Sequence, residues 1–191
     1  MINKSDFIQI RNEIEREDLN REGLIRKSRD LIKLSKLIIY SVHRNDIGKA
    51  KTLLGKIKKE FIALKNIVKN NPGLVSSGAF KVSVQEYVEA ICFCSFVNEK
   101  RLLTCKELGV NPEHYLLGLC DLTGELVRKA INAAIKGEYK EAFLIKDFVS
   151  ELYGEFLLMD LRNGELRKKF DGIKYDLKKL EDLALDLKLK K

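Results

Sequence analysis

The stretch Val84-Gln85-Glu86-Tyr87-Val88-Glu89-Ala90-Ile91 combines apolar residues at helical spacing with two carboxylates. An α-helix through it would carry one apolar stripe, formed by Val84, Tyr87, Val88, Ile91 and Ser95. The opposite side of the same helix would hold Val82, Glu86, Glu89, Phe93 and Val97. A solvated face does not normally collect valine and phenylalanine, so this second side is expected to be partly buried. The pattern therefore predicts a core helix on which Glu86 and Glu89 are neighbours away from bulk water.

Length and composition favour one globular domain over residues 1–191. The chain has 191 residues, 45% of them hydrophobic, with two prolines and a formal net charge of +8. The hydrophobic share is too high for a disordered chain, and the low proline and glycine content is unlike a fibrous protein. The four cysteines are too few for a disulfide scaffold and lack zinc-binding spacing, so they are interpreted as small apolar packing residues.

Nothing in the sequence indicates a membrane or secretory segment. The longest uncharged apolar run spans residues 90–97, far short of the roughly 20 residues of a membrane-spanning helix. The N-terminus, Met1-Ile2-Asn3-Lys4-Ser5-Asp6, lacks the apolar stretch of a signal peptide. We therefore expect a cytoplasmic protein with reduced thiols and no membrane partner.

Apolar residues recur at helical spacing along the rest of the chain, and no segment shows the alternation of a β-strand. Asn111-Pro112-Glu113 is a helix start signal, with a cap residue, proline at the first helical position and an acid next. Gly137 and Gly164 fall between helices. The sequence predicts an all-α bundle of about seven helices, near 3–17, 20–44, 46–69, 74–99, 111–136, 138–158 and 163–189.

The last of these helices has a regular apolar seam. Steps of four and three residues connect Leu166, Phe170, Ile173, Leu177, Leu180, Ala184 and Leu187. Such heptad spacing places all of them on one side of the helix, with charged residues elsewhere. The seam is equally typical of packing within one chain and of a helix shared between subunits.

A second pair of acids lies in the predicted helix over 111–136. Tyr115, Leu119, Leu122 and Leu126 form its apolar stripe, and another side holds Gly118, Asp121, Glu125 and Arg128. Asp121 and Glu125 are four residues apart, so they are like charges on one face. Gly118 and Gly124 lower helix stability relative to alanine, which favours a close approach of another backbone at these positions.

If the two helices lie side by side, four carboxylates converge: Glu86, Glu89, Asp121 and Glu125. Carboxylate oxygens are the ligands that Mg²⁺ prefers, and bound Mg²⁺ orients water and stabilises charge on a phosphate. The chain has no Glu-x-x-His motif, which argues against a di-iron bundle. The alternative interpretation is ion pairing of the acids with Lys81, Arg128, Lys129 or other bases on neighbouring helices.

A basic row lies on the predicted helix over 20–44. Its far side, opposite the apolar stripe, carries Arg26, Arg29, Lys33, Lys36 and Tyr40, with Arg44 at the end. Such a row suits a phosphate backbone, and an aromatic ring within it suits a nucleic-acid base. The same pattern is also typical of an ordinary solvated helix face.

Two of the stretches above resemble the translin family. Gln85-Glu86-Tyr87-Val88-Glu89-Ala90 and the run from Tyr115 to Arg128 are similar to its nuclease subunit, translin-associated factor X (TRAX), as is the segment from Arg29 to Arg44. The run from Leu166 to Lys179 is instead similar to translin itself. The resemblance covers nearly the whole chain.

The resemblance implies an all-α fold of seven helices that assembles into a ring- or barrel-like oligomer, typically an octamer, with nucleic acid inside. It implies Mg²⁺-dependent endoribonuclease activity, with Mn²⁺ as a substitute metal. By motif position, Glu86, Glu89 and Asp121 would be catalytic metal ligands and Glu125 a further ligand or an orienting residue. Translin subunits lack acids at the first three of these positions. The residues expected to bind RNA are Arg26, Arg29, Lys33, Lys36, Arg44 and Arg128.

The chain also departs from the larger relatives that it resembles. It lacks their long insertion ahead of Tyr115, which indicates a compact form that assembles as a homo-oligomer without a second subunit type. The leading prediction is an endoribonuclease that acts on single-stranded RNA or RNA ends inside a homo-oligomeric shell. The alternative is a non-catalytic, translin-like oligomer that binds single-stranded RNA or DNA. A protein-binding scaffold without nucleic-acid affinity is a third class.

Overall fold

The computed structural model describes residues 2–189, which form seven α-helices and one 3-10 helix with no β-strand in that range. The elements in chain order are α1 (Lys4–His43), α2 (Ile47–Asn70), η1 (Pro72–Ser76), α3 (Gly78–Glu99), α4 (Cys105–Leu108), α5 (Pro112–Ile135), α6 (Tyr139–Leu157) and α7 (Glu165–Leu189). The predicted all-α fold is confirmed. Met1, Lys190 and Lys191, which the predicted domain 1–191 includes, lie outside the described residues.

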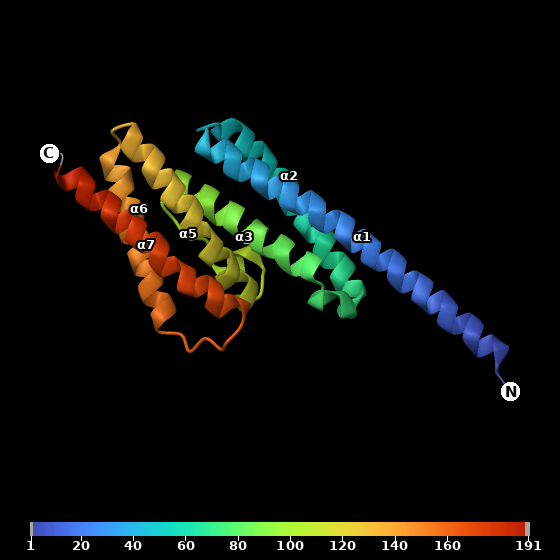
Figure 1. Ribbon diagram of the computed structural model, residues 1–191. Helices are drawn as coiled ribbons and strands as arrows, with labels where there is room; N and C mark the ends of the chain where they lie inside the picture. Colours follow the sequence, from blue (N-terminus) through green and yellow to red (C-terminus); the bar gives the residue numbers. More distant parts are fainter. Residues whose placement is uncertain (1, 190–191) are drawn as a thin grey trace.

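The predicted break between helices 3–17 and 20–44 is wrong, because α1 runs without interruption from Lys4 to His43. Residues 18–20 contain neither proline nor glycine, so the backbone has no reason to leave the helix there. The Oδ1 atom of Asn3 caps the first turn and accepts hydrogen bonds from the N–H groups of Ser5 and Asp6 at 3.2 and 3.4 Å. Residues 4–19 are exposed throughout, and this half of α1 extends away from the other helices (Figure 1).

Two short elements escape the periodicity analysis because each is only about one turn long. The 3-10 helix η1 precedes α3, so α3 begins at Gly78 rather than near residue 74. The helix α4 lies in the predicted loop between residues 99 and 111, and a reciprocal cap begins it. Glu107 N–H donates to Thr104 Oγ1 at 3.2 Å, and Thr104 N–H donates to Glu107 Oε2 at 2.9 Å. Gly109, at φ 64°, ends it.

The helix α3 is the centre of the arrangement (Figure 1). It packs against α1 on one side and α5 on the other, while α1 pairs with α2 and the helices α5, α6 and α7 pack against one another. The α5 start signal works as expected: Pro112 is its first residue, and Asn111 Oδ1 accepts from His114 N–H at 2.8 Å. The two acidic stretches are therefore on adjacent helices.

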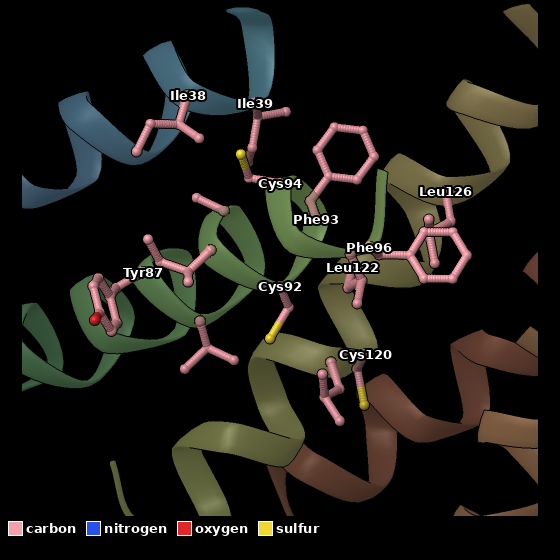
Figure 2. Close-up of a cluster of buried hydrophobic side chains, with 14 of the residues drawn as sticks. Ile38, Ile39, Tyr87, Cys92, Phe93, Cys94, Phe96, Cys120, Leu122 and Leu126 are labelled. Carbon is pink, nitrogen blue, oxygen red and sulfur yellow. The ribbon is translucent and has the colours of Figure 1, made fainter. Parts of the chain in front are cut away.

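Buried side chains from α1, α3 and α5 meet in one cluster, which Figure 2 shows with Ile38, Ile39, Phe93, Phe96, Leu122 and Leu126 among the labelled residues. The predicted apolar stripe of α3 is buried, and Phe93, on the opposite side with Glu89, is completely buried as well. Burying one such side chain contributes about 1.5–3 kcal/mol. The second side of α3 is thus partly buried, as predicted, although Val82 at its start is 45% exposed.

The cysteines and the hydropathy of the helices agree with the sequence analysis. All four cysteines are free, and Cys92, Cys94 and Cys120 are buried in the hydrophobic core. Within residues 2–189 no helix combines the length and the apolar content that crossing a bilayer requires.

The apolar seam of α7 faces its own chain. Phe170, Ile173, Leu180 and Leu187 are buried, and α7 packs on α5 and α6. The aromatic ring of Phe170 stacks on those of Tyr153 and Phe156, with centroids 5.5 and 5.6 Å apart. The heptad spacing therefore serves an intramolecular bundle at these positions.

The contact between α3 and α5 is closest at Gly118. A Cβ atom at this position would lie 2.6 Å from Val88 Cβ and 2.8 Å from the backbone oxygen of Gln85. The predicted close approach is therefore confirmed at Gly118. It is wrong at Gly124, which is exposed, and where a Cβ would meet only Asp176 Oδ2 at 3.9 Å.

Replacing Gly118 with alanine is expected to destabilise the protein by about 1–3 kcal/mol, because the added methyl group has to push α5 away from α3. This loss exceeds the helix-propensity gain of about 1 kcal/mol that alanine brings. Urea unfolding followed by circular dichroism measures the change. Gly55→Ala is the matched control, since nothing lies within 4 Å of a Cβ there; it should be neutral or stabilising. A Gly118→Ala protein as stable as the parent would contradict a close contact between α3 and α5 at this position.

Candidate functional site

The four predicted acids lie on the facing sides of α3 and α5. Glu86 and Glu89 come from α3, and Asp121 and Glu125 come from α5. Glu89 is only 9% exposed, whereas the other three are half-buried. They are close enough for the charge of Asp121 to raise the pKa of both glutamates on α3, alongside the larger effect of burial. The two acid pairs therefore lie on adjacent helices within reach of one another's charge.

Glu89 is the least compensated of these carboxylates. Burial raises its pKa to about 8, and the charges of Asp121, Glu86 and Glu125 act in the same direction. The ammonium of Lys169 lowers the pKa of Glu89, but by less than the other effects raise it. Within residues 2–189, no hydrogen bond or ion pair reaches the Glu89 carboxylate. The ionised form of Glu89 therefore requires positive charge that its surroundings do not supply.

Glu86 lies at the edge of the cluster nearest to α1. Burial raises its pKa, and the Lys36 ammonium, 4.0 Å from Oε1 of Glu86, partly opposes that effect. Lys36 belongs to the predicted basic row. The acids and the basic row are therefore neighbouring parts of one surface.

Asp121 has a close partner in Lys169 of α7. The ammonium nitrogen donates to both carboxylate oxygens, at 2.8 Å to Oδ1 and 2.6 Å to Oδ2. It also donates to Oε1 of Gln85 on α3, at 3.3 Å. One lysine side chain thus connects three helices at the carboxylate cluster.

Glu125 is held by a histidine from α1. The Nε2 atom of His43 lies 2.5 Å from Oε2 of Glu125, and Arg128 NH1 lies 3.7 Å from the same oxygen. The hydrogen bond from His43 lowers the pKa of Glu125, burial opposes it, and Arg128 adds a smaller lowering effect. The His43 ring packs on Phe93 with centroids 4.8 Å apart, which fixes its orientation. Glu125 is therefore an ionised and positioned carboxylate.

The sequence pattern predicts the acids but not most of their partners. Of Lys81, Arg128 and Lys129, only Arg128 contacts an acid of the cluster in the described part of the chain; the Lys129 ammonium is 3.4 Å from Asn45 Oδ1. Lys169 is one of many lysines in α7. Nothing in the local sequence distinguishes it from the others, so its contact with Asp121 could not be predicted. The position of His43 could have been noticed, because it is a histidine that directly follows the buried residues at the end of α1.

The donor set fits a hard divalent cation, because it consists of carboxylates around a buried and unpaired Glu89. The present side-chain arrangement does not amount to a preformed centre. Among residues 2–189, no three histidine, cysteine, aspartate or glutamate side chains are grouped in a way that would hold a metal ion. In this arrangement the Lys169 ammonium contacts both oxygens of Asp121.

The predicted RNA-binding residues are all exposed: Arg26, Arg29, Lys33, Lys36, Arg44 and Arg128. Tyr40, between Lys36 and Arg44 in the row, is 51% exposed. Arg44 NH1 donates to its hydroxyl at 3.3 Å, and the Arg44 guanidinium lies 5.5 Å from the ring centroid. This surface combines cations with an accessible aromatic ring, which is the chemistry of contacts with phosphates and bases.

Comparisons with known proteins agree with the geometry. Human translin is 27% identical over 195 residues, covering 92% of this chain and 86% of that protein. The translin-associated protein X homolog of Schizosaccharomyces pombe is 26% identical over 200 residues, covering 95% of this chain and 86% of that one. Chicken translin (Gallus gallus) is 42% identical over 78 residues, a match that spans 41% of this chain and 34% of the chicken protein.

Two solved structures have the same fold. Apo-NeC3PO superposes with a TM-score of 0.89 at 29% identity, covering 97% of both chains. The AfC3PO–duplex RNA complex superposes with a TM-score of 0.78 at 26% identity, covering 97% of this chain and 98% of that one. The sequence profile of the Translin family matches residues 19–191, which include α3, α5 and all four acids. With fold, acidic stretches and family profile in agreement, this chain belongs to the translin family.

Proposed function

We propose that this protein is a Mg²⁺-dependent endoribonuclease that acts on single-stranded RNA or RNA ends inside a homo-oligomeric shell. The observation that carries the proposal is the buried Glu89, with a pKa raised to about 8 by burial and by three neighbouring carboxylates. Such a carboxyl is mostly protonated near pH 7, and a bound cation would stabilise its ionised form. A related structure, the AfC3PO–duplex RNA complex, supports RNA as the polymer.

The residues divide into metal ligands and an orienting group. Glu86, Glu89 and Asp121 would hold Mg²⁺, or Mn²⁺ in its place, through their carboxylate oxygens. A metal held there would act as a Lewis acid, which would make water a stronger nucleophile and stabilise charge on a phosphodiester. Glu125, kept ionised by the His43 hydrogen bond, would orient the ligands or complete their number.

The basic row would hold the RNA backbone next to the acids. Lys36 is 4.0 Å from Glu86, and Arg128 is 3.7 Å from Glu125, so cations border the carboxylates on two sides. Arg26, Arg29, Lys33 and Arg44 continue this surface along α1. Phosphate contacts of this kind are independent of base sequence, so single-stranded DNA is a second expected ligand.

Substituting Glu89 with glutamine, or Glu86 with glutamine, is expected to lower Mg²⁺-dependent cleavage of single-stranded RNA on the order of 100-fold or more, because each change removes an anionic ligand. Cleavage of an end-labelled RNA with Mg²⁺ and with EDTA measures the effect. Glu60→Gln is the matched control: Glu60 is a half-buried glutamate that pairs with Lys27 on α1, outside the cluster. Folded Glu89→Gln protein that cleaves at the parent rate would refute the assignment.

A second candidate function is favoured by the ion pair between Lys169 and Asp121. A carboxylate already bound by an ammonium on both oxygens can be a structural group, as in a non-catalytic oligomer that binds single-stranded RNA or DNA. In that case the acids would affect folding but not turnover. The two functions share the basic row and differ in whether any RNA is cleaved.

Removing two cations of the row, as in Arg29→Gln/Lys33→Gln, is expected to weaken RNA binding and to flatten its salt dependence. Each lost phosphate contact lowers the slope of log K against log salt by about 0.7 for a single strand. Fluorescence anisotropy of a labelled RNA in EDTA, over a salt series, measures both quantities. Lys58→Gln/Lys59→Gln removes the same charge from an exposed part of α2 and should match the parent apart from a weak general effect. Equal slopes for the two double variants would exclude the row as the contact surface.

The oligomeric shell is supported by the free half of α1. Phe7, Ile10 and Ile14 share one face of this helix and are 52%, 42% and 54% exposed. Apolar side chains on a helix that extends away from its own bundle favour burial against another subunit. We propose a homo-oligomer, with an octamer as the expected size.

Phe7→Glu/Ile14→Glu is therefore expected to shift the protein to smaller assemblies without unfolding it, because it places charges on the proposed contact. Size-exclusion chromatography with light scattering measures the mass, and circular dichroism monitors the helices. Ile62→Glu is the control, since Ile62 is 60% exposed on α2. A double variant with the mass of the parent would contradict a contact through this face.

A further inference from the structure

Lys169 is part of the carboxylate cluster although it belongs to another part of the chain. It lies near the start of α7, and its side chain reaches Asp121 of α5 and Gln85 of α3. An ammonium group has three N–H donors. The three contacts, at 2.6, 2.8 and 3.3 Å, account for all of them.

The contacts of Lys169 involve the same oxygen atoms that a metal ion would need. Both Asp121 oxygens accept from the ammonium, so a cation that approaches Asp121 meets a positive charge already 2.6–2.8 Å from each oxygen. The Lys169 charge also lowers the pKa of Glu86 and of Glu89, in each case against the larger effect of burial. One monovalent cation therefore partly neutralises a cluster of four acids.

The Lys169 ammonium can move from the carboxylate cluster into solvent. Its side chain is 29% exposed, and a lysine side chain is a flexible stem that ends in a strongly hydrated charge. Moving the ammonium into water leaves Asp121 open to another ligand. A divalent cation that enters brings twice the charge that leaves, which suits the carboxylates better.

From these contacts we propose that Lys169 is a positioning residue, a built-in counter-ion that occupies Asp121 when no divalent cation is bound and competes with Mg²⁺ for that carboxylate. This inference rests on the proposed function, because it concerns the loading of the same site. It explains how four acids remain folded together without metal. It also makes the apparent Mg²⁺ affinity lower than the carboxylates alone would give, because Mg²⁺ has to displace the Lys169 ammonium or bind beside a like charge.

Isothermal titration calorimetry of the metal-free full-length protein with MgCl₂ tests the competition. Lys169→Met keeps the length of the side chain and removes its charge, so Mg²⁺ should bind about tenfold more tightly than in the parent. Lys169→Arg replaces the ammonium with a planar guanidinium that can donate to both oxygens of Asp121. Because this ion pair is stronger, Mg²⁺ should bind several-fold more weakly than in the parent.

Lys27→Met is the matched control. The Lys27–Glu60 pair, at 2.8 Å, has side-chain exposures of 34% and 32%, against 29% and 32% for Lys169–Asp121. Removing Lys27 should leave the Mg²⁺ affinity at the parent value. The melting temperature of each variant with and without Mg²⁺ gives a second readout. Lys169→Met should melt lower than the parent without metal and gain more on Mg²⁺ addition.

The possible results separate the two proposals. If the parent binds Mg²⁺ and Lys169→Met binds it equally or more weakly, Lys169 is no competitor and this inference is wrong, while the proposed metal site stands. If neither the parent nor Lys169→Met binds Mg²⁺, the metal site and the inference both fail. Binding only in Lys169→Met would be the extreme form of the proposed competition.

Discussion

The contact of α5 with α3 at Gly118 is the constraint on which the rest of the structure depends. The helices approach until no side chain fits between Gly118 and the Val88 side chain. Glu89 follows Val88 directly, and Asp121 lies one turn beyond Gly118. The same packing that buries the core therefore forces carboxylates of two helices together. A fold selected for stability alone would place apolar or paired residues at these positions.

The electrostatic penalty of that contact is only partly relieved within the chain. Lys169 binds Asp121, His43 and Arg128 contact Glu125, and Lys36 approaches Glu86, so each of three acids has at least one basic neighbour. No ion pair reaches Glu89 among the described residues, and its pKa rises to about 8 because burial and three carboxylates outweigh the charge of Lys169. This residual deficit distinguishes the cluster from an ordinary set of ion pairs. It is the physical reason for expecting a cation that the chain itself does not provide.

The features that sequence could predict are those set by local periodicity. The buried stripe of α3, the acid pairs at spacings of three and four, and the small residue at Gly118 follow from helical geometry alone. The predicted break in α1 is wrong because residues 18–20 contain no proline or glycine that would interrupt the helix. The partners of the acids were mostly missed because they depend on tertiary contacts. Lys169 is 48 residues from Asp121 in sequence, and His43 is 82 from Glu125.

The pKa of the Glu89 carboxyl group tests the proposed cation site most directly. It can be measured by a pH titration with ¹³C NMR of protein labelled at the glutamate side chains, and Glu89→Gln assigns the signal. Without metal, the account predicts a pKa of about 8. With saturating Mg²⁺ the pKa should fall by roughly two units or more, because a bound divalent cation stabilises the ionised form. A pKa near the ordinary value of 4.5, or a raised pKa that Mg²⁺ does not change, would contradict a cation-binding cluster.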